Sequence, residues 1–155
     1  MTYLPMSKGF MYLVAILDVY SRFVVGWDIS NSMQAEWVIQ TLQLAILSYG
    51  KCQIINSDQG SQFTCKKWVE YLKNETIQIS MDGKGRAIDN VYIERLWRTV
   101  KYEYLYLNPP DDGWQLYQGL EQFFERYNYH KYHQGIDRST PASRFYSIKI
   151  ESVFN

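Results

Sequence analysis

Cysteine is scarce and a long apolar segment is missing, and each shortage excludes a class of protein. The chain has 155 residues and 2 cysteines, Cys52 and Cys65, too few for the disulfide framework of a small secreted domain. Twelve residues separate them, whereas zinc sites place paired cysteines about two to four residues apart, so zinc is disfavoured. No charged leader precedes an apolar stretch, and no run approaches the roughly 20 apolar residues that span a bilayer. We therefore expect no membrane partner and a cytoplasmic protein.

An excess of charge is also absent. Lysine and arginine number 16, aspartate and glutamate number 16, and the formal net charge is zero. This balance disfavours strong independent affinity for nucleic acid, because proteins with such affinity are often basic. The charge is unevenly placed, however, since eight lysines and arginines lie between Lys66 and Lys101. A bound metal would neutralise nearby acids and leave this part of the surface locally positive.

The order of the expected elements predicts an α/β domain. Apolar runs bounded by turn residues indicate strands, and apolar residues at spacings of three and four indicate helices. The expected strands are 2–5, 10–17, 22–29, a short strand that ends at 57, and 77–80; the expected helices run from a cap at Ser32 to Gly50, then lie at 65–74, at 89–101, across 117–127 and after Pro141. This order predicts a mixed sheet flanked by helices, with a core at 1–109 and a C-terminal helical extension at 110–155.

The helix expected at 89–101 has one apolar and one polar side, with Asp89 as its N-cap. A solvated surface helix would show the same pattern. The apolar stripe consists of Ile93, Leu96, Trp97, Val100 and Tyr104. The polar side groups one carboxylate with an amide and two cations, namely Glu94, Asn90, Arg98 and Lys101.

A second candidate site lies at 54–64. A short apolar run ends near Asp58, a turn follows at Gly60, and Thr64 is a plausible cap for the next helix. Ligands of open α/β sheets bind beyond the carboxyl ends of the strands, which is where this pattern places Asp58. The alternative is an aspartate that only shapes the turn through bonds to its own backbone.

Four groups of residues stand together at the spacings of one family. They are Asn56-Ser57-Asp58-Gln59-Gly60-Ser61-Gln62-Phe63; Ser80-Met81-Asp82-Gly83-Lys84-Gly85-Arg86; Asp89-Asn90 with Glu94 and Lys101; and Tyr127-Asn128 with His133 and Thr140-Pro141. With 35 residues between Asp58 and Glu94, the chain resembles, over nearly its whole length, the catalytic core of bacterial insertion-sequence transposases of the DDE group, which are related to retroviral integrases.

This resemblance implies an RNase H-like fold and metal-dependent DNA strand cleavage and strand transfer during transposition. Asp58 and Glu94 would be catalytic residues and metal ligands, with Mg²⁺ or Mn²⁺ as the cofactor. Lys84 and Arg86 lie in a glycine-containing loop that is either an ordinary connection or an arm that contacts DNA phosphates. The residues expected to bind DNA are Lys84, Arg86, Asn90, Arg98 and Lys101.

One departure from the family pattern affects the expected activity. The family's first catalytic aspartate stands just before a segment that resembles residues 1–5, so this chain starts one position too late to contain it. A two-metal site is expected only with that aspartate, and the chain alone is expected to be inactive. Asp18 could substitute for it, but we favour a role for Asp18 in the turn before Arg22.

The sequence is compatible with three functions. The chain is the core of a transposase, or a non-catalytic remnant or regulatory fragment that binds DNA, or an RNase H-like nuclease without transfer activity. The expected partners are DNA, both element ends and target, and either further copies of the chain or full-length transposase. We also expect the protein to associate with the nucleoid.

Overall fold

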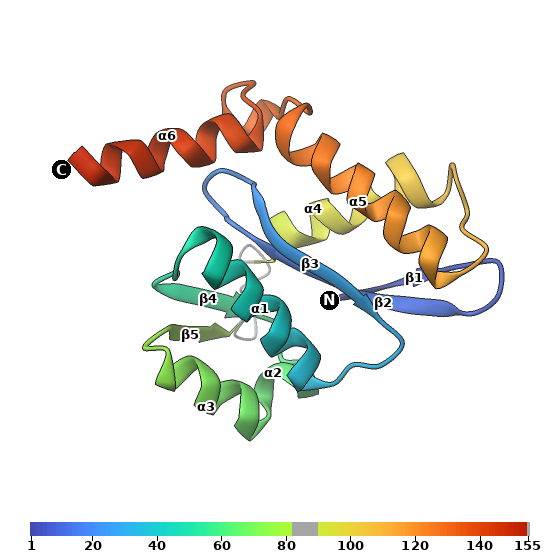
Figure 1. Cartoon of the computed structure of the whole chain (residues 1–155), viewed down its shortest axis with the longest axis horizontal. Coiled ribbons are helices and arrows are strands. Elements are labelled where there is room, and N and C mark those ends of the chain that lie inside the picture. Colours follow the sequence, from blue (N-terminus) through green and yellow to red (C-terminus); the bar gives the residue numbers. More distant parts are fainter. Residues whose placement is uncertain (82–89, 155) are drawn as a thin grey trace.

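The computed structural model describes residues 1–81 and 90–154, with side chains described as far as residue 148. Three strands come first in this part of the chain, two further strands follow with helices between them, and helices make up the rest (Figure 1). The strands are β1 (Thr2–Pro5), β2 (Phe10–Leu17), β3 (Val24–Ser30), β4 (Ile54–Ser57) and β5 (Gln78–Met81). The helices are α1 (Ala35–Tyr49), α2 (Ser61–Thr64), α3 (Lys66–Asn74), α4 (Val91–Val100), a π-helical turn η1 (Lys101–Leu105), α5 (Gly113–Tyr129), a 3₁₀ turn η2 (Gln134–Ile136) and α6 (Pro141–Phe154).

The strands form an antiparallel group and a parallel pair. β1, β2 and β3 are antiparallel in that order, with Thr2 opposite Leu13 and Tyr12 opposite Ser30. β4 and β5 are parallel, with Ile54 opposite Gln78. Both orientations therefore occur, as the expected mixed sheet requires, although within the described residues the strands form two sheets rather than one. Helices lie on both sides of the antiparallel sheet, which confirms the predicted fold class (Figure 1).

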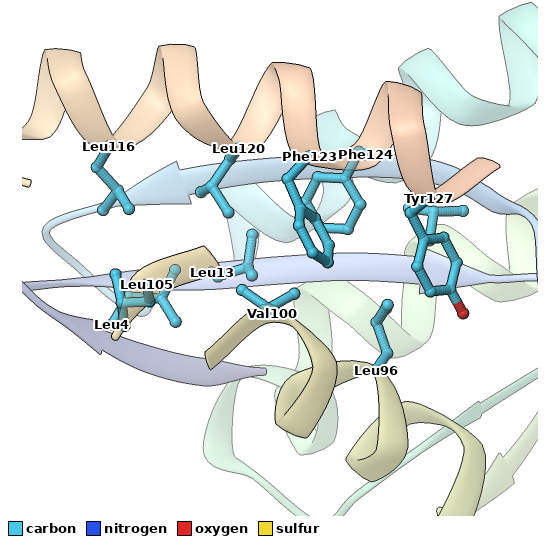
Figure 2. Close-up of a cluster of buried hydrophobic side chains, with 11 residues drawn as sticks. Leu4, Leu13, Leu96, Val100, Leu105, Leu116, Leu120, Phe123, Phe124 and Tyr127 are labelled. Carbon is cyan, nitrogen blue, oxygen red and sulfur yellow. The ribbon is translucent and has the colours of Figure 1, made fainter. Parts of the chain in front are cut away.

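One apolar core lies between the antiparallel sheet, α4 and α5. Figure 2 shows side chains of α5 pointing toward those of the sheet and of α4, with Leu13 and Val100 near the middle. The buried members are Leu4, Leu13, Val24, Leu96, Val100, Leu105, Leu116, Leu120, Phe123, Phe124 and Tyr127. The apolar stripe predicted for 89–101 therefore faces a core and not solvent.

The π-helical turn explains how this stripe continues past α4. A π turn inserts one residue into the helical repeat and so shifts the phase of the residues that follow. Leu105 is consequently buried, while Tyr104, the residue expected from α-helical spacing, is partly buried beside it. Both side chains reach the same core.

A second core covers the opposite face of β2. Val14 of β2 packs with Val38 and Leu42 of α1 and with Trp68 and Leu72 of α3. Along β2 the odd-numbered residues face α4 and α5, and the even-numbered residues face α1, as the alternation of a strand requires. This second core holds β4 and the residues after it in place.

Two helix caps differ from those predicted. Gln34 and not Ser32 precedes α1, and the backbone N–H of Ser32 donates to the hydroxyl of Ser30 instead. Thr64 is the last residue of α2, where its hydroxyl donates to the carbonyl of Gly60. Short polar side chains satisfy backbone groups in several ways, so their position in the sequence does not by itself fix a cap.

Other helix boundaries follow the prediction. Gly50 ends α1 with a φ of 90°, a value that favours glycine, and its N–H donates to the carbonyl of Ile46. Thr140 caps α6 by accepting a hydrogen bond from the N–H of Ser143 at 3.2 Å. Asp89, the cap predicted for α4, lies outside the described residues.

We expect His133 to make the unfolding free energy depend on pH. Burial first and the charge of Lys131 second lower the pKa of His133 from its ordinary 6.5, and within the described part of the chain its buried Nε2 has no hydrogen-bond partner. Below pH 6.5 the unfolded chain therefore binds a proton that the folded chain resists. We expect the unfolding free energy to fall with falling pH, by at most about 1.4 kcal/mol per pH unit from this residue. Urea unfolding at pH 7.5 and pH 5 measures the slope.

The variant His133→Gln isolates this contribution. The unfolding free energy of this variant should differ less between pH 7.5 and pH 5 than that of the parent chain. His130→Gln is the matched control and should leave the difference as it is in the parent. An unchanged pH dependence in His133→Gln would show that other groups cause the slope.

Candidate active site

Asp58 directly follows β4, at the carboxyl end of that strand. Its side chain is partly buried, and Oδ1 accepts a hydrogen bond of 2.8 Å from the backbone N–H of Gly60. A Cβ atom added to Gly60 would lie 2.9 Å from that Oδ1 and 2.4 Å from Nε2 of Gln62. A larger residue at position 60 would therefore displace the side chains of Asp58 and Gln62, and the hydrogen bond from the Gly60 N–H orients the Asp58 carboxylate.

Glu94 lies in the first turn of α4, where its side chain is exposed and its backbone N–H donates to the carbonyl of Asn90 at 3.0 Å. The position near a helix N-terminus favours a negative side chain. Asn90 is the residue before α4, so these two predicted site residues occupy one turn of backbone.

A cavity of about 1070 Å³ connects this turn with Asp58. Its lining includes Asp58, Asn90 and Ile93 but not Glu94, the residue next to Ile93. Met1 and Asp18 also line it. The structure thus brings the end of β4 and the first turn of α4 to the border of one cavity.

The α-amino group of Met1 lies near Asp58. Burial lowers the pKa of this amino group, and the negative charge of Asp58 partly opposes the shift. An electrostatic influence of this kind requires proximity. Met1 and Asp58 both line the cavity.

Asp18 acts within its own turn. Its Oδ2 accepts hydrogen bonds from the backbone N–H of Ser21, at 2.8 Å, and from the Ser21 hydroxyl, while its carbonyl accepts from the N–H of Arg22. These contacts agree with the turn role favoured from the sequence. They occupy one carboxylate oxygen of Asp18.

Two of the predicted DNA-binding cations, Lys101 and Arg98, lie beside tyrosine rings. Nζ of Lys101 is 4.9 Å from the centroid of the Tyr3 ring, and the exposed Arg98 guanidinium is 5.7 Å from that of Tyr102. Neither lines the cavity. Lys84 and Arg86, with the loop that carries them, lie outside the described residues.

Arg22 is a residue that sequence reasoning did not single out. Its guanidinium carbon is 3.5 Å from the centroid of the Tyr92 ring, a close cation–π contact between the β2–β3 turn and the first turn of α4. Arg22 has a φ of 65°, and both residues line the cavity. No local pattern could have revealed this contact, because 69 residues separate the two.

The donor set suits a hard divalent cation, although it is small. Carboxylates at Asp58 and Glu94 and an amide at Asn90 offer oxygen ligands, which Mg²⁺ prefers, and one or two carboxylates can suffice for an ion that also binds phosphate. Over residues 1–81 and 90–154, no three His, Cys, Asp or Glu side chains gather in a metal-binding group.

Comparison with known proteins places the chain in a family. A model described as Integrase core domain matches residues 1–87, and a second model with the same description matches residues 75–141. The chain belongs to the integrase core domain family. Its fold is the RNase H-like fold of such cores.

The relatives within this family are insertion-sequence transposases, as the sequence resemblance predicted. The chain is 33% identical to the transposase for insertion sequence element IS904 from Lactococcus lactis subsp. lactis (strain IL1403), over 91% of this chain and 57% of that protein. It is 32% identical to transposase InsF for insertion sequence IS3A from Escherichia coli (strain K12), over 66% of this chain and 36% of that protein. The chain thus spans 57% and 36% of the length of these two relatives.

Solved structures share the fold. The catalytic core domain of HTLV-2 integrase in complex with magnesium, in a dimeric form, matches with a TM-score of 0.73 and 19% identity over 93% of this chain and 90% of that one. A chain of the simian T-cell lymphotropic virus intasome, in complex with a PP2A regulatory subunit, matches with a TM-score of 0.79 and 17% identity over 93% of this chain and 51% of that one. Among the described residues of this chain, no helix has both the length and the apolar character needed to cross a membrane.

Proposed function

We propose that the cavity bordered by Asp58 and the first turn of α4 is the site of a metal-dependent DNA strand cleavage and strand transfer reaction. One observation carries the proposal: two carboxylates far apart in the sequence lie on elements that meet at this cavity. The family's role in DNA transposition and integration sets the class of substrate. Element ends and target DNA are the proposed partners, and further copies of the chain or full-length transposase are the proposed assembly partners, which would associate with the nucleoid.

The reaction proposed for this site is an in-line displacement at phosphorus. An oxygen of water, or of a 3′-hydroxyl group, bonds to phosphorus while the bond to the leaving oxygen breaks. A divalent cation held by Asp58 and Glu94 would neutralise the charge that develops on the phosphate oxygens. Asn90 would position Glu94 or the scissile strand, and Lys101 and Arg98 would contact DNA phosphates. Lys84 and Arg86 are proposed as further phosphate contacts.

A third carboxylate is proposed at the position immediately before Met1. Met1 lines the same cavity as Asp58, which supports a carboxylate next to Met1 as a further ligand at this site. With that aspartate the site would hold two ions, and without it we expect little strand transfer.

Metal titration tests the assignment. We expect a chain that carries Met-Asp before Met1 to bind Mn²⁺ at least about tenfold more tightly than the printed chain, since a further carboxylate strengthens a hard-cation site. Isothermal titration calorimetry measures both affinities. Glu94→Gln in the extended chain should abolish the gain. Glu121→Gln, an exposed acid of α5 that does not line the cavity, is the control. Equal affinities in the two parent chains would contradict the proposed site.

A further inference from the structure

Three aromatic side chains form a continuous row on the hairpin of β1 and β2. Tyr3 lies opposite Tyr12 in the strand register, and Phe10 precedes Tyr12 by two residues, so all three share one face of the sheet. The rings of Tyr3 and Phe10 meet edge to face with centroids 6.2 Å apart, and those of Phe10 and Tyr12 with centroids 5.3 Å apart. We call Tyr3, Phe10 and Tyr12 the aromatic strip.

This strip is the open part of a face that is otherwise covered. Val14, on the same face of β2, packs against α1, whereas the hairpin extends beyond the end of that helix (Figure 1). Tyr3 is 58% exposed and Phe10 is 51% exposed. The opposite face carries Leu4 and Leu13, which are fully buried. Large exposed rings in one row mark a binding surface more often than isolated ones do.

Cations lie at the strip, and the strip begins beside the candidate active site. Lys101 comes to Tyr3 at the edge strand β1, with Nζ 4.9 Å from the ring centroid. Lys8 is exposed in the turn between the strands, where the hydroxyl of Ser7 also donates to the carboxylate of Asp111. Tyr3 is two residues from Met1, which lines the cavity together with Asp58. The strip therefore leads away from the proposed site of strand cleavage.

A row of aromatic rings with cations beside it is a surface that can bind single-stranded nucleic acid. Bases stack on the rings regardless of sequence, and cations contact the phosphates between them. Bases within a duplex are stacked on each other and cannot reach such rings. An acidic peptide would use the lysines but not the ring faces, and an aliphatic peptide would leave the lysines without partners.

We propose that the aromatic strip stacks unpaired bases of a DNA strand end that leaves the active site, with Lys101 on the adjoining phosphate. This inference rests on the proposed function, because it takes DNA as the substrate of the neighbouring cavity. It adds a preference that the proposed function does not contain. DNA with an unpaired end binds more tightly than a blunt duplex.

Fluorescence anisotropy with labelled DNA tests the proposal. The probes are a single-stranded oligonucleotide of mixed sequence, a blunt duplex, and the same duplex with an unpaired end. The double variant Tyr3→Ala with Phe10→Ala should weaken binding of the single strand and of the unpaired end at least about tenfold, and binding of the blunt duplex less than about twofold. The double variant Tyr3→Phe with Phe10→Tyr keeps both rings and should bind as the parent does. Tyr132→Ala removes a ring that is 72% exposed elsewhere and is the surface control.

Each result has a clear meaning. Equal losses on the single strand and the blunt duplex, or no loss on either, would overturn the strip as a stacking surface. If Lys101→Ala and Arg98→Ala weaken duplex binding while the strip variants have no effect, the proposed function stands and this inference fails. If the parent chain binds none of the three probes, both fail. Because both replaced rings are half exposed, thermal unfolding should show near-parental stability in the alanine variant.

Discussion

Replacing Glu94 with glutamine is expected to reduce strand cleavage at least about a thousandfold in a chain that carries an aspartate before Met1. The amide keeps the size and shape of the carboxylate but loses the charge that holds a divalent cation. Metal ions contribute several kcal/mol of transition-state stabilisation, and about 1.4 kcal/mol corresponds to a factor of ten in rate. The measurement is the initial rate of nicking of a labelled element-end duplex with Mg²⁺ or Mn²⁺ in excess.

Controls distinguish a lost ligand from a lost fold. Asp58→Asn should show a loss of the same order, because both residues would hold metal, and the double variant should lose little more than either single one. Glu121→Gln should cleave as the parent does. Thermal unfolding of Glu94→Gln should match the parent, since the side chain is exposed. Cleavage within about threefold of the parent would remove Glu94 from the catalytic residues and contradict its role as a metal ligand.

The sequence predicted the elements that present the candidate site because their patterns are local. Apolar residues at three and four positions define the buried side of α4, and the side with Glu94 is exposed as that pattern requires. The run before Asp58 is strand β4, and Asp58 follows it directly. Strand alternation and helix periodicity operate within a few residues, so they can be read without knowing what each element packs against.

The contacts that hold these elements together were not predictable in the same way. Arg22 lies on Tyr92 because a turn between strands happens to meet the start of α4. The π turn after Val100 brings both Tyr104 and Leu105 to one core. Helical spacing predicted only Tyr104 as a core residue. Such features follow from tertiary packing, which overrides local preference.

Asn128 is the clearest of these long-range contacts. The sequence analysis noted it as part of a family motif without giving it a structural role. In the structure its side chain is buried on α5, where Oδ1 accepts from the N–H of Val24 at 2.9 Å and Nδ2 donates to the Val24 carbonyl at 3.0 Å. Val24 is itself buried at the start of β3. One amide thus satisfies both backbone groups of a residue 104 positions away.

Asn128→Ala is therefore expected to lower the unfolding free energy by about 2–5 kcal/mol. The substitution leaves the N–H and carbonyl of Val24 buried without partners, and each such group costs roughly 1–3 kcal/mol. A loss of this size is a large fraction of the about 5–15 kcal/mol that stabilises a typical domain. Urea unfolding measures it, with Asn108→Ala, an exposed asparagine, as the control.

Asn128→Asp separates the two hydrogen bonds. A carboxylate can still accept from the N–H of Val24, but it cannot donate to the Val24 carbonyl and would bring a charge into a buried position. It should therefore be at least as destabilising as alanine, and raising the pH should increase its effect. A loss below about 0.5 kcal/mol in Asn128→Ala would mean that water replaces both bonds, and that α5 is held to β3 by the apolar core alone.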